Sequence, residues 1–308
     1  LKMSYKKATL FFNPEAGYGR KKNIFQKNPP HKKHYETLLK TIQETFSQNN
    51  YELTTIIIHK SIDTTKITST LSPKETDLVI AAGGDGTINK IINGLMISKI
   101  PLGIIPIGSV NILALDLKIS NDIKTACNQI INGSPKKIDI GQANTHYFSS
   151  MAGIGFDAKV IKHTPLQLKK KHGLLSFAYI AFKILSTYKY RPIRLSINNE
   201  LAIQTAYFII INNSKYYGGK FIVSPQSSLT DGKLDITLLK KGNFIALFKF
   251  FKHLINGTLD QCKEVELIQT SQLSLKENEK HHTHVDAEYI GKHHVTINIV
   301  PLGLTIIY

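Results

Sequence analysis

Residues 79–96 read VIAAGGDGTINKIINGLM, so an apolar run ends in three glycines with one aspartate between them, and a helical pattern follows directly. A short apolar run is typical of a buried strand, and the spacing after it is typical of a helix. Glycine permits positive φ and has no Cβ to obstruct a ligand. The free N–H groups of a helix start favour an anion. The glycines and the helix start therefore indicate a phosphate-binding loop.

Asp85 stands between these glycines, and its charge conflicts with that interpretation because a carboxylate repels phosphate. The conflict disappears if Asp85 holds Mg²⁺ or accepts the proton of an attacking hydroxyl, and both are tasks of a kinase. The motif alone leaves one structural alternative open, a tight turn in which Asp85 is the N-cap of the helix.

The segments around this loop alternate between strand-like and helix-like patterns as far as about residue 133. The strand-like runs are 7–14, 51–60, 77–84 and 101–108, and the helix-like runs are 34–50, 88–96 and 111–133. Such alternation predicts a parallel, doubly wound α/β sheet. A loop that follows a parallel strand lies at the carboxyl edge of the sheet, where ligands bind in such folds.

The pattern changes after about Lys137 to short strand-like runs separated by turn residues. Two helix-like insertions, 166–189 and 243–256, interrupt these runs. A length of 308 residues suggests about two domains. We therefore expect an α/β domain over 1–137 and a β-sandwich over 138–299, with a last strand at about 300–308 that returns to the first domain.

The chain is strongly basic, with a net charge of +17 from 39 Lys and Arg against 22 Asp and Glu. Such a charge favours anionic partners, namely nucleic acid, nucleotide phosphates or an acidic membrane surface. We expect no nucleic-acid binding, because no zinc finger, RNP-type motif or recognition helix is recognisable. Cys127 and Cys262 lie far apart and fit a reducing compartment, and no secretion signal or membrane span is recognisable. These features predict a cytoplasmic protein.

The GGDGT loop with its helix resembles the phosphate-binding loop of the diacylglycerol kinase catalytic-domain family, which includes bacterial lipid kinases, sphingosine kinases and ceramide kinases. Further segments resemble the same family in the same order: NPEAGYGR (13–20), PIGSVNILALDL (106–117), KIDIGQAN (137–144), GIGFDAKV (153–160), YYGGKFIVSPQSSLTDGKLDITLL (216–239) and VDAEYI (285–290). The resemblance thus covers nearly the whole chain. It implies a first domain like that of NAD kinase and phosphofructokinase.

The resemblance also implies ATP and Mg²⁺ as cofactors and a lipid hydroxyl as acceptor, most simply that of diacylglycerol. The residues implied to contact ATP are Asn13, Gly83, Gly84, Gly86, Thr87, Asn89, Gly108, Ser109 and Asn111. Asp85 is implied to act at the acceptor hydroxyl or to organise the catalytic Mg²⁺. Glu288, with Asp286, is implied as metal ligand or base, and Asp231 as ligand of a structural Mg²⁺.

Three positions depart from the family pattern. Ser109 replaces threonine but keeps a hydroxyl, whereas Ile112 stands where many members carry a carboxylate. Ala287 replaces glycine between Asp286 and Glu288, which matters only if that position needs positive φ. A catalytically weak pseudokinase therefore stays open as an alternative, as does a soluble kinase like NAD kinase.

Residues 174–189 and 244–255 are strongly apolar on a helical pattern and have basic residues within or beside them. Such helices can lie on an anionic membrane surface or pack against the β-domain, and both can hold at once. We expect peripheral membrane association, and we leave the oligomeric state open, a homodimer included. The histidines at 281, 282, 284, 293 and 294 match no zinc template and are expected to be exposed hairpin residues.

Overall fold

The computed structural model of the chain describes residues 6–16, 31–185, 187–198, 200–219 and 221–308. It divides into two compact units, Leu1–Ile138 with Gly303–Tyr308, and Asp139–Leu302. The division expected after residue 137 and the return expected at about residue 300 lie close to these limits. Residues 17–20 of the NPEAGYGR segment lie outside the described residues.

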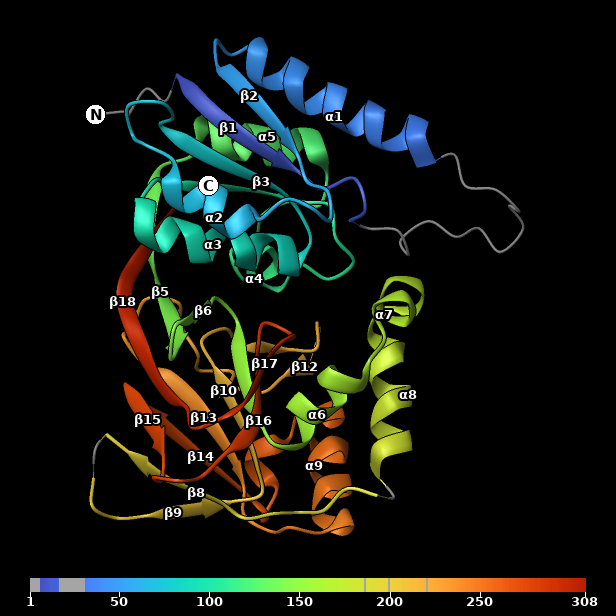
Figure 1. Ribbon diagram of the computed structural model, residues 1–308, viewed down its shortest axis with the longest axis vertical. Coiled ribbons are helices and arrows are strands. Elements are labelled where there is room, and N and C mark those ends of the chain that lie inside the picture. The colour runs from blue at the N-terminus through green and yellow to red at the C-terminus, as the bar shows by residue number, and fades with distance from the viewer. Residues whose placement is uncertain (1–5, 17–30, 186, 199, 220) are drawn as a thin grey trace. The chain divides into compact units, whose positions relative to one another are not determined.

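The first unit is built on a parallel sheet with the strand order β2-β1-β3-β4-β18 (Figure 1). Its strands are β1 (Lys7–Phe12), β2 (Glu52–Ile57), β3 (Leu78–Gly83), β4 (Leu102–Pro106) and the end of β18 (Thr296–Ile307). Every residue of β3 and of β4 is buried. A parallel sheet that is covered on both faces requires such continuous apolar runs. The predicted α/β fold is therefore confirmed.

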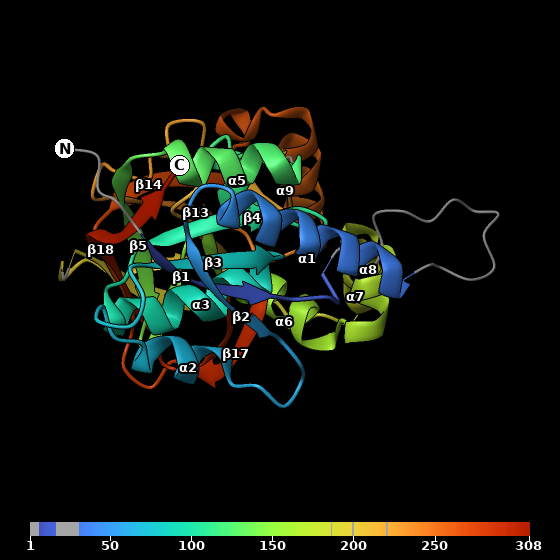
Figure 2. The same ribbon diagram turned by 90° about the horizontal axis from the view of Figure 1, so that it is seen from above.

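Helices cover both faces of this sheet. They are α1 (His31–Ser47), α2 (Thr64–Thr70), α3 (Asp85–Ser98), α4 (Ile112–Asp116) and α5 (Ile123–Asn132). Figure 2 shows α1 and α5 on one face and α2 and α3 on the other. The side chains of Asp63 and Asp122 cap α2 and α5 by accepting backbone N–H groups, whereas α3 begins at Gly84 without a side-chain cap among the described residues.

The second unit contains an antiparallel sheet of order β14-β13-β10-β7-β16-β17. Its strands are β7 (Met151–Ile154), β10 (Phe208–Asn212), β13 (Leu234–Leu239), β14 (Val265–Thr270), β16 (His281–Val285) and β17 (Glu288–His293). Side chains alternate along them, so that Ile209 and Ile211 enter one apolar cluster while Phe208 and Ile210 enter another. The sheet is thus buried on both faces.

The first of these clusters also contains side chains of other strands of the unit, as the predicted β-sandwich requires. These strands are β5 (Pro135–Ala143), β6 (His146–Phe148), β8 (Ile193–Ile197), β9 (Gln204–Ala206), β15 (Gln272–Leu275) and the beginning of β18. A separate short pair is formed by β11 (Tyr216–Tyr217) and β12 (Phe221–Ile222).

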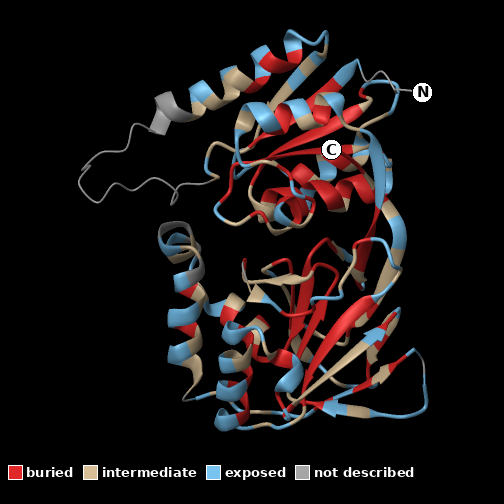
Figure 3. Ribbon diagram, turned by 180° about the vertical axis from the view of Figure 1, so that it is seen from behind, coloured by how far each residue is buried: buried red, intermediate tan, exposed pale blue. Residues whose placement is uncertain are grey.

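Helices cover the second cluster, on the other face of the six-stranded sheet (Figure 3). They are α6 (Phe156–His163), α7 (Leu166–His172), α8 (Leu174–Leu185) and α9 (Phe244–Asn256), and a 3₁₀ turn at Leu259–Gln261 follows. The first helix-like insertion therefore consists of two helices. Gly173 separates them, because its φ of +54° is incompatible with a continuous α-helix.

Candidate nucleotide and catalytic site

The glycine loop lies at the switch point of the parallel sheet. Strand β1 has β2 on one side and β3 on the other, and in such a sheet ligands bind beyond the carboxyl ends of these strands. Asn13 follows β1, and its N–H donates to the carbonyl of Ala82 at 2.9 Å. Its Nδ2 donates to Oγ1 of Thr87 at 2.7 Å. The turn after β1 is therefore tied to the first turn of α3.

Two glycines bring the loop after β3 against the loop after β4. A Cβ on Gly108 would lie 2.4 Å from Cα of Gly84 and 2.7 Å from Oδ1 of Asn111. The N–H groups of Ile107 and Gly108 both point to the carbonyl of Gly83, at 3.1 and 3.2 Å. The two loops thus form a surface of bare backbone at the start of α3, where a phosphate group fits.

Asp85 links the same two loops through its carboxylate. Its Oδ2 accepts the N–H of Asn111 at 3.0 Å, and its Oδ1 accepts the N–H of Ile112 at 2.7 Å. The alternative in which Asp85 is the N-cap of its own helix is wrong, because Gly84 holds that position and Asp85 instead accepts N–H groups at the start of α4. Asp85 contacts the backbone N–H of Ile112 and not its side chain. The lack of a carboxylate side chain at position 112 therefore does not break this contact.

Asn111 completes this cluster. It has a φ of 57°, is 1% exposed, and donates from Nδ2 to the carbonyl of Gly108 at 2.9 Å. No donor within the described ranges reaches its buried Oδ1. A buried acceptor without a partner is costly unless a ligand or water supplies a donor. This orphaned atom, beside the bare backbone, is what a bound nucleotide would be expected to satisfy.

The remaining residues implied to contact ATP lie beside this cluster or further along α3. Ser109 is exposed beside Gly108, and Gly86 lies in the first turn of α3. Asn89 is buried one turn later and accepts from Nδ2 of Asn93 at 3.2 Å. The structure thus connects Asn13 to Thr87, and Asp85 to Asn111 beside Gly84 and Gly108.

A nucleotide-borne Mg²⁺ fits the donor set of this loop. In the described part of the chain, no three His, Cys, Asp or Glu side chains gather closely enough to hold a metal ion by themselves. Mg²⁺ in kinases, however, is held by one or two carboxylates together with phosphate oxygens and water. Each oxygen of Asp85 accepts a backbone N–H group, and the two oxygens of a carboxylate present about four lone-pair sites in all.

In the second unit, Asp286 and Ala287 form the two-residue turn between β16 and β17. Their φ angles are 44° and 60°, as a type I′ hairpin turn requires. The departure from glycine at Ala287 therefore has a structural cost, because a non-glycine residue is strained in this region.

The carboxylate of Asp286 is buried and turned toward the backbone of the segment before β7. Its Oδ2 accepts from the N–H and the hydroxyl of Ser149 at 2.8 and 3.2 Å. Its Oδ1 accepts the N–H groups of Ser150 and Met151 at 2.9 and 3.0 Å. Successive N–H groups of this kind form an anion-binding nest. Asp286 thus anchors the turn, and Glu288 presents the exposed carboxylate.

Asp231 is exposed in the turn before β13, where its Oδ1 accepts the N–H of Lys233 at 3.0 Å. Its role as a Mg²⁺ ligand stays a prediction. Asp139, which no sequence pattern marked as a site residue, is fully buried and accepts the N–H groups of Gly232 and Leu302, each at 2.7 Å. An aspartate within the otherwise apolar run IDI was the available signal, because a buried carboxylate needs dedicated donors.

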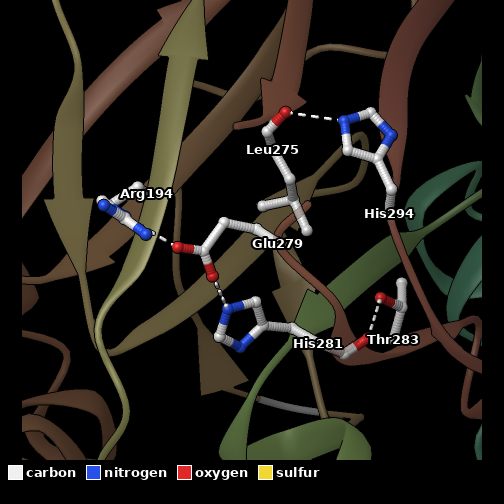
Figure 4. Close-up of polar contacts among 6 residues, drawn as sticks. All are labelled: Arg194, Leu275, Glu279, His281, Thr283 and His294. Atoms are coloured by element: carbon white, nitrogen blue, oxygen red, sulfur yellow. Dashed lines mark hydrogen bonds and ion pairs between the residues drawn. The ribbon is translucent and has the colours of Figure 1, made fainter. Parts of the chain in front are cut away.

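The expectation that the clustered histidines are exposed is wrong, because the other four are half-buried and His284 is buried. His284 is 1% exposed and lies with Nε2 2.8 Å from Oδ2 of Asp157. His281 is bonded to Glu279 at 2.8 Å (Figure 4). Burial, and then the nearby positive charges of Lys162 and other basic residues, lower the pKa of His282 to about 4. His284 and His281 therefore each contact a different carboxylate.

The architecture defines the class of protein: a nucleotide-binding α/β unit of kinase type joined to a β-sandwich unit. Comparison with known proteins supports this class. Residues 7–143 match the family described as "Diacylglycerol kinase catalytic domain", and residues 150–308 match the "YegS C-terminal NAD kinase beta sandwich-like domain". The chain belongs to the diacylglycerol kinase catalytic-domain family, as its resemblance predicted, and is thus a member of a lipid kinase family.

Individual relatives support this assignment. A diacylglycerol kinase of Bacillus subtilis is 30% identical over 93% of this chain and 91% of its own length. One from Staphylococcus saprophyticus is 28% identical over 93% of this chain and 90% of its own length. The crystal structure of a diacylglycerol kinase from Bacillus anthracis shares the fold, with a TM-score of 0.72 and 23% identity over 100% of this chain and 98% of that one. These findings favour a lipid kinase over the alternative of an NAD kinase.

Proposed function

We propose that this protein transfers the γ-phosphate of ATP to the hydroxyl of diacylglycerol and so makes phosphatidic acid. The observation that carries the proposal is the bare backbone surface formed by Gly84 and Gly108 at the start of α3, with Asp85 fixed beside it. Diacylglycerol enters as the substrate because the relatives that align over nearly the whole chain bear that name.

The first unit supplies the nucleotide site in this proposal. The phosphates lie on the glycine backbone and the N–H groups of α3, and Oδ1 of Asn111 accepts a hydrogen bond from the bound nucleotide or its water. Asp85, together with phosphate oxygens, would hold Mg²⁺, which neutralises charge on the transferred group when bound. Alternatively, the same carboxylate accepts the proton of the acceptor hydroxyl. In either role, its two backbone bonds fix its orientation.

The second unit supplies a further carboxylate. Glu288 is exposed at the first position of β17, immediately after the turn that Asp286 anchors. Phosphoryl transfer depends on positioning and charge neutralisation more than on covalent chemistry. A carboxylate on a firmly anchored turn suits that task as metal ligand or base.

We further infer that the second unit docks on an anionic bilayer. On α8 the exposed Leu175, Tyr179 and Phe182 follow one another at helical spacing, at 73%, 61% and 80% exposure. On α9, Phe244 and Phe248 stack 6.3 Å apart and are also exposed. The opposite faces of both helices pack into the apolar cluster under them, and this packing is compatible with the proposed membrane contact of the exposed side chains.

Basic residues complete that surface. Lys183 on α8 and Lys252 on α9 are exposed near the apolar side chains. Each cation near an anionic surface contributes about 1 kcal/mol, and buried apolar area adds to this. Within the described ranges, no helix is both long enough and apolar enough to cross a bilayer. An interfacial position of α8 and α9 is the arrangement that these exposed residues fit.

The activity is tested by transfer of label from ATP to a panel of micellar lipids, with NAD included as a soluble acceptor. We expect label on diacylglycerol with the wild type and at least a hundredfold loss with Asp85→Ala. Asp122→Ala is the matched control, because Asp122 also caps a helix of the first unit but lies outside the loop. Label on NAD alone would refute the lipid acceptor. ATP binding without transfer to any acceptor would instead support the pseudokinase, which Ile112 keeps open.

Membrane docking is tested by sedimentation with vesicles of phosphatidylglycerol and phosphatidylcholine against vesicles of phosphatidylcholine alone. We expect binding to the anionic vesicles and release by added salt, because salt screens charges at the surface. Equal binding to both kinds of vesicle, or binding that salt does not change, would contradict the role of the basic residues.

A further inference from the structure

A buried polar cluster lies among the apolar side chains beneath the helices of the second unit. Its centre is the contact between Nε2 of His284 on β16 and Oδ2 of Asp157, the second residue of α6, at 2.8 Å. The side chains are 1% and 12% exposed. An ionised carboxylate only accepts, so the hydrogen of this bond is on Nε2 of the imidazole. No partner among the described residues reaches Nδ1.

The sheet makes room for this contact by a missing side chain. His284 pairs with Gly153 on the neighbouring strand β7. A Cβ on Gly153 would lie 2.3 Å from Nε2 of His284 and 2.9 Å from Oδ2 of Asp157. Any larger residue at this position would therefore push the imidazole and the carboxylate apart.

A third segment joins the cluster through Tyr217 on β11. Burial, and then the charge and the hydrogen bond of Asp157, raise the pKa of Tyr217 well above its ordinary value. The phenol thus stays protonated and donates to the carboxylate. Asp157 therefore connects α6 to both β11 and β16.

The strand that carries His284 ends in the turn of Asp286 and Ala287, which leads to Glu288. That turn is also held by the nest around Asp286 and by Nζ of Lys169, 3.3 Å from the carbonyl of Ala287. A polar pair in an apolar core costs desolvation, and apolar residues of the same volume often stabilise a fold as well or better. The pair of His284 and Asp157 lies close to this turn along β16, which indicates a role other than stabilising the fold.

The geometry points to His284 and Asp157 as positioning residues for phosphoryl transfer: their bond fixes β16 to α6 and thereby holds the turn that presents Glu288. The inference rests on the proposed role of Glu288. The pair touches no reacting atom, so its loss is expected to lower kcat and leave the KM for ATP unchanged.

The test uses the full chain and three variants. His284→Gln keeps a donor near the position of Nε2, and His284→Leu removes it. Asp157→Ala combined with His284→Leu replaces the pair by apolar side chains of nearly the same combined volume, so no unpaired charge remains to unfold the protein. The matched control is His281→Leu, which breaks the 2.8 Å contact to Glu279 at the other end of the same strand (Figure 4).

The readouts are kcat and KM with micellar diacylglycerol, and hydrogen exchange at the amides of Ala287 and Glu288. We expect the double variant to stay folded, with about tenfold lower kcat, an unchanged KM for ATP and about tenfold faster exchange at the turn. His284→Gln and His281→Leu should resemble the wild type. A folded double variant with wild-type kcat and wild-type exchange would show that the pair is only structural.

The two proposals can fail separately. If the wild type phosphorylates no lipid, the proposed function is lost, and the hydrogen-exchange arm alone decides whether the pair holds the turn. If the wild type is active and exchange at the turn is unchanged in the double variant, the positioning role is overturned while the kinase assignment stands.

Discussion

Replacement of Ala287 by glycine is expected to stabilise the second unit, although it removes a methyl group and adds no contact. Ala287 has a φ of 60°, where an ordinary L-residue is strained by about 1–2 kcal/mol. Glycine relieves that strain but makes the unfolded chain more flexible, which offsets about 0.4–1 kcal/mol. The net gain is then about 0.5–1 kcal/mol, which corresponds to a rise in Tm of roughly 1–4 °C for a unit of this size.

Urea unfolding followed by circular dichroism measures this change as a shift in the midpoint with an unchanged slope. Ala178→Gly is the matched control, because Ala178 is exposed within α8 and the same substitution in a helix costs about 1 kcal/mol. The two variants should therefore move in opposite directions. A midpoint for Ala287→Gly at or below that of the wild type would refute the assignment of strain to this turn.

Three further predictions follow from particular contacts. Gly108→Ala should abolish ATP binding in calorimetry, because its Cβ would lie 2.4 Å from Cα of Gly84 and force the two loops apart. The pKa of His282 is lowered to about 4, so the folded state binds fewer protons than the unfolded state, and stability should fall as the pH drops from about 6.5 to about 4. Asparagine at this position should flatten that part of the pH profile. Phe248→Glu should weaken binding to anionic vesicles, whereas Ile97→Glu, at a similarly exposed residue of the first unit, should leave it unchanged.

Each of these has a clear contrary result. Wild-type ATP affinity in Gly108→Ala would mean that the nucleotide does not use the contact between the loops. An acid-unfolding profile of His282→Asn that matches the wild type would assign the loss of stability to other groups. Equal effects of the two glutamate variants on vesicle binding would remove α9 from the docking surface.

The sequence alone determined the fold class and the place of the glycine loop. Both rest on local patterns: a buried strand, a run of glycines and a helix are adjacent in the chain, and their periodicities differ. Asn13 and the glycine loop lie at one edge of the sheet because each follows the carboxyl end of one of two neighbouring parallel strands, and ligands bind at that edge in such folds. The family resemblance added the residue roles, which the local patterns do not contain.

The tertiary structure decided which task each polar side chain has. Asp85 takes its two donors from residues 26 and 27 positions later, and Asp286 takes its own from residues 135 to 137 positions earlier. His284 is buried because its partner Asp157, 127 positions away, lies across the gap left by Gly153. A carboxylate or an imidazole looks the same in the sequence whether it meets solvent, a ligand or a distant backbone. Its partner is set by strand register and helix packing, and these are formed by contacts between residues far apart in the chain.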